Sequence, residues 1–101
     1  MTFALVALDE LTLPPGVMVR EVRVERSAAG DVQRLAVPIA AWNEILPGHR
    51  RQIHDHVVAL GIEAWCADGL VVFHRPRLPL HSGARRAHAK RVAFLLGPVP
   101  A

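Results

Sequence analysis

The sequence predicts a small α+β domain, and three features of the chain lead to that prediction. An alternating, valine-rich β-hairpin is expected over residues 17–38, helical spacing is expected over 39–46 and 48–64, and turn residues separate these elements. The chain has 101 residues, of which 51% are hydrophobic, so it can bury a core of its own. We expect one domain over 1–101, with a basic C-terminal segment at 73–101.

The strands are predicted from alternation of apolar and polar residues. Valines alternate with charged residues along a strand at 17–26, and Gly30 suits the tight position of the loop that follows. The return strand is expected at about 32–38. A short apolar run at 3–8 is suited to a buried strand. Together these residues predict an antiparallel sheet built on the 17–38 hairpin.

Helical spacing replaces alternation after the hairpin. Pro38 suits the first turn of the 39–46 helix, and Pro47 can open the second helix. The apolar stripe of that second helix has the spacing i, i+4, i+7 and i+11 and consists of Ile53, Val57, Leu60 and Ala64. We expect both helices to pack on one face of the sheet.

The remaining chain is harder to assign from its pattern. Ala67–Gly69 is a turn signal, and 70–74 is expected to be a strand that pairs with Trp65-Cys66 or with the first hairpin. Ser82 is a candidate cap for a helix over 83–91. Residues 92–96 are all apolar, so periodicity leaves helix and strand open over 75–96.

Charge is unevenly distributed along the chain. Residues 1–72 hold six arginines against nine acids, a net charge of −3, whereas 73–101 carry six basic residues and no acid, which gives the total of +3. Such asymmetry favours an acidic partner. The candidate site for nucleic acid or an acidic partner is Arg75, Arg77, Arg85, Arg86, Lys90 and Arg91.

The six histidines do not form a recognisable catalytic or metal motif. His54 and His56 point about 200° apart on a helix, so they cannot bind one ion together. We therefore predict no metal site, no cofactor and no catalytic residue. A site assembled from distant histidines, such as His56 with His74, stays open as a basis for acid–base chemistry.

The single cysteine, Cys66, excludes an internal disulfide and favours an intracellular protein. The apolar run at 3–8 has no positive residue before it and is followed by acids, which is wrong for a signal peptide. No apolar stretch reaches the roughly 20 residues that a membrane span needs. We expect a cytoplasmic location without membrane contact, and a buried position for Cys66 and for both tryptophans.

Three functions are carried forward from the sequence. The first is a non-enzymatic protein-binding module, such as an adaptor, inhibitor or assembly subunit, which an exposed sheet edge would also allow to form a homodimer. The second is a nucleic-acid-binding protein that uses the basic C-terminal segment. The third is a metal-independent acid–base enzyme such as a ribonuclease.

Overall fold

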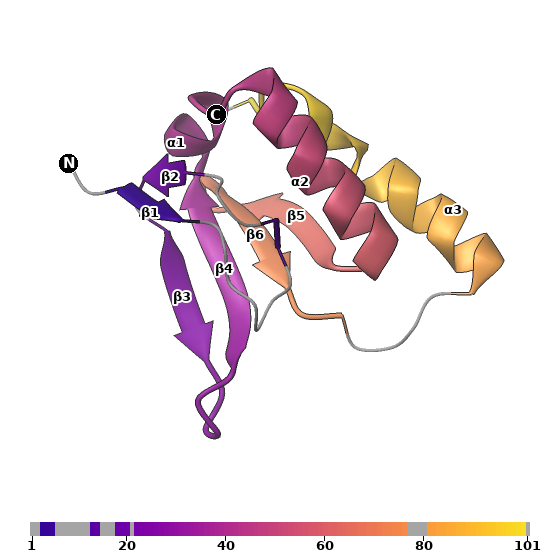
Figure 1. Ribbon diagram of the computed structural model, residues 1–101, viewed down its shortest axis with the longest axis horizontal. Helices are drawn as coiled ribbons and strands as arrows, with labels where there is room; N and C mark the ends of the chain where they lie inside the picture. The colour runs from indigo at the N-terminus through magenta and orange to yellow at the C-terminus, as the bar shows by residue number, and fades with distance from the viewer. Residues whose placement is uncertain (1–2, 6–12, 15–17, 21, 77–80, 101) are drawn as a thin grey trace.

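Four antiparallel strands form the central sheet of the computed structural model, in the spatial order β3 (Arg23–Arg26), β4 (Val32–Pro38), β6 (Leu70–His74) and β5 (Glu63–Ala67) (Figure 1). The structure describes residues 3–5, 13–14, 18–20, 22–76 and 81–100. Helices accompany this sheet, and the predicted α+β fold is confirmed.

The predicted hairpin is present as β3 and β4, but the strand expected at 17–26 is divided. Its first part, β2 (Met18–Arg20), pairs with β1 (Phe3–Leu5) in a separate two-stranded sheet. Strict alternation is confined to residues 22–25, and the consecutive charges Arg20 and Glu21 interrupt it where the strand divides. The strand expected at 3–8 is seen as β1, and residues 6–8 lie outside the described residues. Gly30 occupies the tight position of the β3–β4 loop with φ of +92°.

Two helices follow β4, and proline positions explain where both begin. Pro38 is the N-cap of α1 (Ile39–Asn43), and Pro47 is the first residue of α2 (Pro47–Leu60), where its missing N–H costs no intrahelical bond. Within the described residues, no helix is long and apolar enough to cross a membrane.

Both helices are shorter than predicted. The helix expected over 39–46 ends at Asn43, and the one expected over 48–64 ends at Leu60. Gly61 terminates α2 because it adopts the left-handed conformation, with φ of 70°. The chain then reverses into β5, so Ala64 matches the helical stripe by spacing alone.

The C-terminal part folds as α3 (Ser82–Arg91) and a 3₁₀ helix, η1 (Ala93–Leu96). The α3 prediction is close, but His81 rather than Ser82 caps the helix. The backbone N–H of Ala84 donates to His81 Nδ1 at 3.3 Å. The apolar run that the sequence left open after α3 is helical.

The core lies between the helices and one face of the four-stranded sheet. Trp42 of α1 and Phe73 of β6 form its aromatic centre, with ring centroids 5.7 Å apart and planes inclined by 51°. Burying each large apolar side chain stabilises the fold by about 1.5–3 kcal/mol. The fully buried neighbours are Leu35, Val37, Ile53, Val57, Ile62, Val71 and Leu95.

Asn43 ties the C-terminal tail to the end of α1. Its Nδ2 donates to the carbonyl of Val99, and the Val99 N–H donates to its Oδ1, both at 2.8 Å. Val99 is itself buried in the core. One side chain thus joins two backbone groups that lie 56 positions away in sequence.

We predict that Asn43→Ala lowers the free energy of unfolding by about 1–3 kcal/mol, because two backbone groups lose their partner. Urea denaturation followed by tryptophan fluorescence measures this change. Asn43→Asp keeps the acceptor for the Val99 N–H and loses the donor to the Val99 carbonyl. Its free energy of unfolding should therefore lie between those of the natural chain and Asn43→Ala. An Asn43→Ala midpoint equal to that of the natural chain would contradict the prediction.

Candidate functional site

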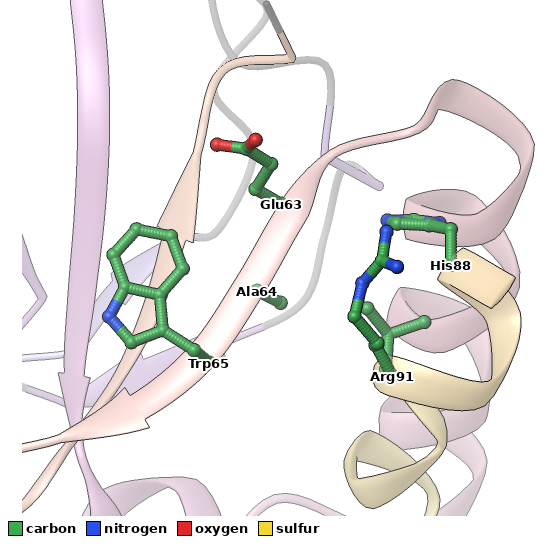
Figure 2. A pocket seen from close by; sticks show the side chains of 6 residues that line it. Glu63, Ala64, Trp65, His88 and Arg91 are labelled. Carbon is green, nitrogen blue, oxygen red and sulfur yellow. The ribbon is translucent and has the colours of Figure 1, made fainter. Parts of the chain in front are cut away.

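A groove lies between strand β5 and helix α3, at one edge of the sheet (Figure 2). Its volume is about 320 Å³. Figure 2 shows His88 and Arg91 projecting from the helix toward the strand, and Trp65 turned to the far side of the strand. The lining residues are Glu63, Ala64 and Trp65 from β5 with His88, Arg91 and Val92 from α3.

A two-residue turn fixes the register of β5 against β6. Asp68 and Gly69 have φ of 52° and 74°, the left-handed values that a type I′ turn requires. Such a turn closes on a residue pair that exchanges both N–H···O=C bonds, and here that pair is Ala67 and Leu70. The turn predicted at these residues is confirmed.

The register decides which backbone groups of β5 face the groove. Hydrogen-bonded and non-hydrogen-bonded pairs alternate along an antiparallel ladder. Counting back from the turn, Glu63 and Trp65 exchange bonds with β6. Ala64 and Cys66 therefore direct their N–H and C=O groups away from β6, toward the open edge of the sheet.

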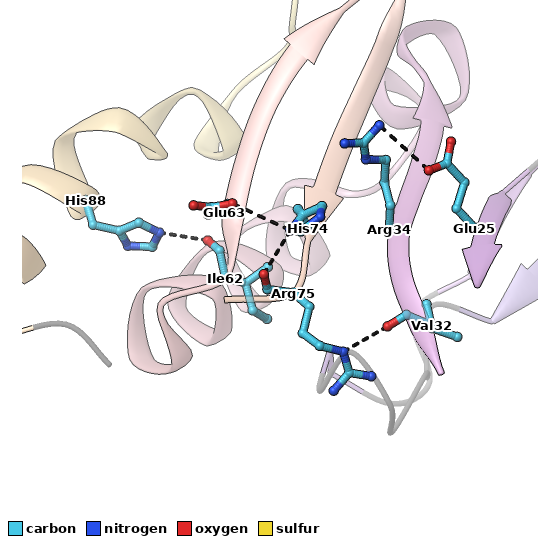
Figure 3. Close-up of polar contacts among 8 residues, drawn as sticks. All are labelled: Glu25, Val32, Arg34, Ile62, Glu63, His74, Arg75 and His88. Atoms are coloured by element: carbon cyan, nitrogen blue, oxygen red, sulfur yellow. Dashed lines mark hydrogen bonds and ion pairs between the residues drawn. The ribbon is translucent and has the colours of Figure 1, made fainter. Parts of the chain in front are cut away.

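Three hydrogen bonds just beyond the ladder agree with this orientation. His88 Nε2 donates to the carbonyl of Ile62 at 2.7 Å, from the α3 side (Figure 3). The N–H of Ile62 also faces away from β6 and donates to the Val57 carbonyl of α2 at 3.2 Å. The N–H of Arg75 donates to the carbonyl of Gln33 in β4 at 3.0 Å, which continues the alternation of β6.

The outer edge of β5 therefore has a hydrogen-bond partner at its start and unpaired backbone groups further along, within the described residues. His88 occupies the carbonyl of Ile62, immediately before the strand. Among the described residues, no further strand or helix pairs with the outward groups of Ala64 and Cys66. An open edge of this kind can pair with an extended chain.

The opposite edge of the sheet, at β3, is protected. All four of its residues are exposed, and three of them are the charged Arg23, Glu25 and Arg26. The ladder to β4 also shifts register between Glu25 and Arg26. Charged side chains and bulges discourage strand pairing, so the two edges of the sheet differ.

His88 is the residue that attaches α3 to this edge. Its side chain is 3% exposed, and its Nε2–H must be the donor because the Ile62 carbonyl can only accept. Its Nδ1 is buried and has no hydrogen-bond partner among the described residues. The sequence presents His88 only as one of six histidines, so its role could not be predicted.

The sheet face opposite the helices carries a polar row across all four strands (Figure 3). Arg34 Nη1 lies 3.7 Å from Glu25 Oε2, and His74 Nδ1 lies 3.6 Å from Glu63 Oε2. Trp65 adjoins the row, with the Arg34 guanidinium 5.5 Å from its ring centroid and the His74 ring 6.2 Å away. The expectation that Trp65 is a core residue is wrong, since it is only partly buried on this face.

The six basic residues predicted as a site do not lie together in one patch. Arg75 Nε donates to the Val32 carbonyl at 2.9 Å, which belongs to β4, the second strand from β5 (Figure 3). Arg77 lies outside the described residues. The other four belong to α3 and are exposed: Arg85, Arg86, Lys90 and Arg91. Among them, Arg85 already interacts with another group of the protein. Of these four, Arg91 lines the groove.

The histidines are dispersed over the fold. His54 Nδ1 contacts Asp55 Oδ1 of its own helix at 2.9 Å. His74 is on the polar face of the sheet, whereas His56 is on α2, which packs against the other face, so these two histidines do not share a site. No group of three metal-ligating side chains occurs within the described residues.

Cys66 is exposed, which corrects the expectation that it is buried. It follows Trp65 in β5, next to the turn, where β6 lies on one side and no described strand lies on the other. Partial burial nonetheless raises the pKa of its thiol. A raised pKa lowers the thiolate fraction at neutral pH, which is the reverse of what a catalytic cysteine needs.

The groove itself was not predicted, because Glu63 and Ala64 were assigned to a helix and α3 was placed without a neighbour. The strand predicted at 70–74 is β6, and it pairs with both of the expected neighbours, β5 on one side and β4 of the first hairpin on the other. No family model matches the chain, and neither a curated protein nor a solved structure matches it.

We predict that His88→Leu lowers the free energy of unfolding by about 1–3 kcal/mol, since the buried Ile62 carbonyl loses its donor. Hydrogen exchange of the α3 amides should accelerate together with this loss. His49→Leu is the control, because His49 is exposed on α2 and its replacement should change stability by less than about 0.5 kcal/mol. Equal stability of both variants would contradict the anchoring role of His88.

We also predict that iodoacetamide alkylates Cys66 more slowly in the folded protein than in the denatured protein at about pH 8, because the raised pKa reduces the thiolate population. The difference should narrow as the pH rises through the folded-state pKa. Mass spectrometry of the alkylated protein gives both rates. Faster alkylation of the folded form at the same pH would indicate an activated thiol instead.

Proposed function

We propose that this chain is a small protein-binding module that receives an extended segment of a partner protein as an added strand along β5. One observation carries the proposal: the N–H and C=O groups of Ala64, which lines the groove, and of Cys66, two residues further along β5, face away from β6, and no described strand pairs with them. An incoming strand would pair these groups, and side chains around the groove would supply selectivity. An adaptor, inhibitor or assembly subunit binds its partner in this manner.

The length of the open edge limits what backbone pairing contributes. His88 closes one end and the Asp68-Gly69 turn closes the other, so Ala64 and Cys66 are the residues that remain for pairing. Each hydrogen bond adds only about 0.5–1.5 kcal/mol net. Contacts with α3 are therefore needed for useful affinity, and the groove provides them.

Nucleic-acid binding is the second candidate function. The observation in its favour is the exposure of Arg86, Lys90 and Arg91 on α3, since arginine and lysine neutralise phosphates. It requires affinity that falls steeply with salt. Arg75 is directed toward β4 instead of α3, since its Nε donates to the Val32 carbonyl.

We predict that Cys66→Pro abolishes strand addition without unfolding the sheet. The N–H of Cys66 faces away from β6, so proline removes an outward donor and leaves the β5–β6 ladder intact. Peptides selected from a random displayed library on the natural chain should protect the amides of Ala64 and Cys66 from exchange. Their affinity for Cys66→Pro should fall by about tenfold or more.

Cys66→Ser is the matched control, because it removes the thiol and keeps the N–H, and its affinity should equal that of the natural chain. Selected peptides that bind Cys66→Pro unchanged, or that protect amides elsewhere, would contradict strand addition.

Light scattering on the peptide-free protein tests whether the chain forms a homodimer. A dimer whose Ala64 and Cys66 amides are already protected would show that a second copy, not a partner segment, occupies the edge.

A further inference from the structure

We infer that the segment received at β5 is acidic and that one of its carboxylates binds the guanidinium of Arg91. This inference rests on the proposed function and specifies the chemistry of the partner. The partner segment is an extended peptide that places an aspartate or glutamate on the side facing α3. The argument uses the charge of the helix, the contacts of Arg91 and the alternation of side chains along a strand.

Helix α3 forms one wall of the groove and is positively charged, and Arg91 is the one of its four cations that lines the groove itself. The helix contains Arg85, Arg86, Lys90 and Arg91, and it has no acidic residue. No acid follows Asp68 anywhere in the chain, so no nearby carboxylate in sequence offsets this charge. A segment with negative charge is attracted to such a wall, and a segment with positive charge is repelled.

Arg91 is the cation that this wall directs into the groove. It is exposed and lines the groove, and no described residue hydrogen-bonds or ion-pairs with its guanidinium. Glu63, the acid among the lining residues, already lies 3.6 Å from His74 on the other face of the sheet. A planar guanidinium with free donors matches a carboxylate in a bidentate geometry.

The alternation of side chains along a strand determines where the carboxylate must be. Successive side chains of an added strand point to opposite faces of the sheet. On the helix side they meet the groove residues His88 and Arg91 of α3 and Val92, its C-cap, which follow one another at the spacing i, i+3 and i+4. On the other side an acid would approach Glu63 and be repelled. The segment should therefore carry its acid on the helix side only.

A second copy of the chain fits this groove less well than an acidic segment. If β5 of another molecule paired antiparallel with β5, it would present Ala64 and Cys66 to α3, because these residues lie on the helix side of its own sheet. Its Glu63 would lie on the opposite face. The second copy thus brings no carboxylate to Arg91.

The test is peptide display from one random library on three proteins: the natural chain, Arg91→Glu and Arg86→Glu. Both variants make the same charge change on α3, but Arg86 does not line the groove. Peptides selected on the natural chain and on Arg86→Glu should be enriched in aspartate or glutamate at one position. That enrichment should disappear on Arg91→Glu, and lysine should replace it.

Affinities of one selected peptide give the quantitative form of the test. Replacing its acid by glutamine should weaken binding to the natural chain by about tenfold, and Arg91→Glu should weaken the acidic form at least as much. Arg86→Glu should change the affinity by less than about threefold. The loss should shrink as salt concentration rises, since the added attraction is electrostatic.

Three results would overturn the inference, and they are distinguishable. Peptides that protect the Ala64 and Cys66 amides without enrichment of acids would remove the acidic specificity and leave strand addition in place. A library that yields no peptide protecting these amides would overturn both the acidic specificity and strand addition itself. Binding of random-sequence DNA or RNA, weakened equally by Arg86→Glu and Arg91→Glu, would assign α3 to phosphate recognition instead.

Discussion

The two-residue turn between β5 and β6 is the constraint on which the rest of the site depends. Asp68 and Gly69 both adopt left-handed φ, so Ala67 must pair with Leu70 and the register of the hairpin follows. Aspartate is among the few non-glycine residues that tolerate this conformation. A slip of one residue would exchange the two faces of β5 and turn a different set of backbone groups outward.

This register also explains why a groove exists at all. One face of the sheet is covered by helices over an apolar core, and α3 extends beyond the last strand, where His88 holds it to the Ile62 carbonyl. His88 is the buried side chain by which α3 reaches the start of β5. Among the described residues, the strand beyond that point has no partner on its outer side, and Arg91 and Val92 line the groove there.

Much of the fold could be predicted, because its signals lie close together in the sequence. The return strand at 32–38 coincides with β4, and Pro47 marks the start of α2. The failures concern features that depend on distant contacts, such as the change of sheet between β2 and β3. The candidate site shows the same limit: six basic residues are visible as charge, but only the fold separates Arg75, bound to β4, from Arg91 in the groove.

The short open stretch of β5 sets the stoichiometry of any complex formed there. Long open edges let sheets grow from molecule to molecule, which leads to fibres. Here His88 and the Asp68-Gly69 turn leave room for one brief segment, and the charged, bulged strand β3 gives no second point of growth. If a partner segment adds to β5 as proposed, each molecule would accept one such segment, and the added strand would not start growth from molecule to molecule.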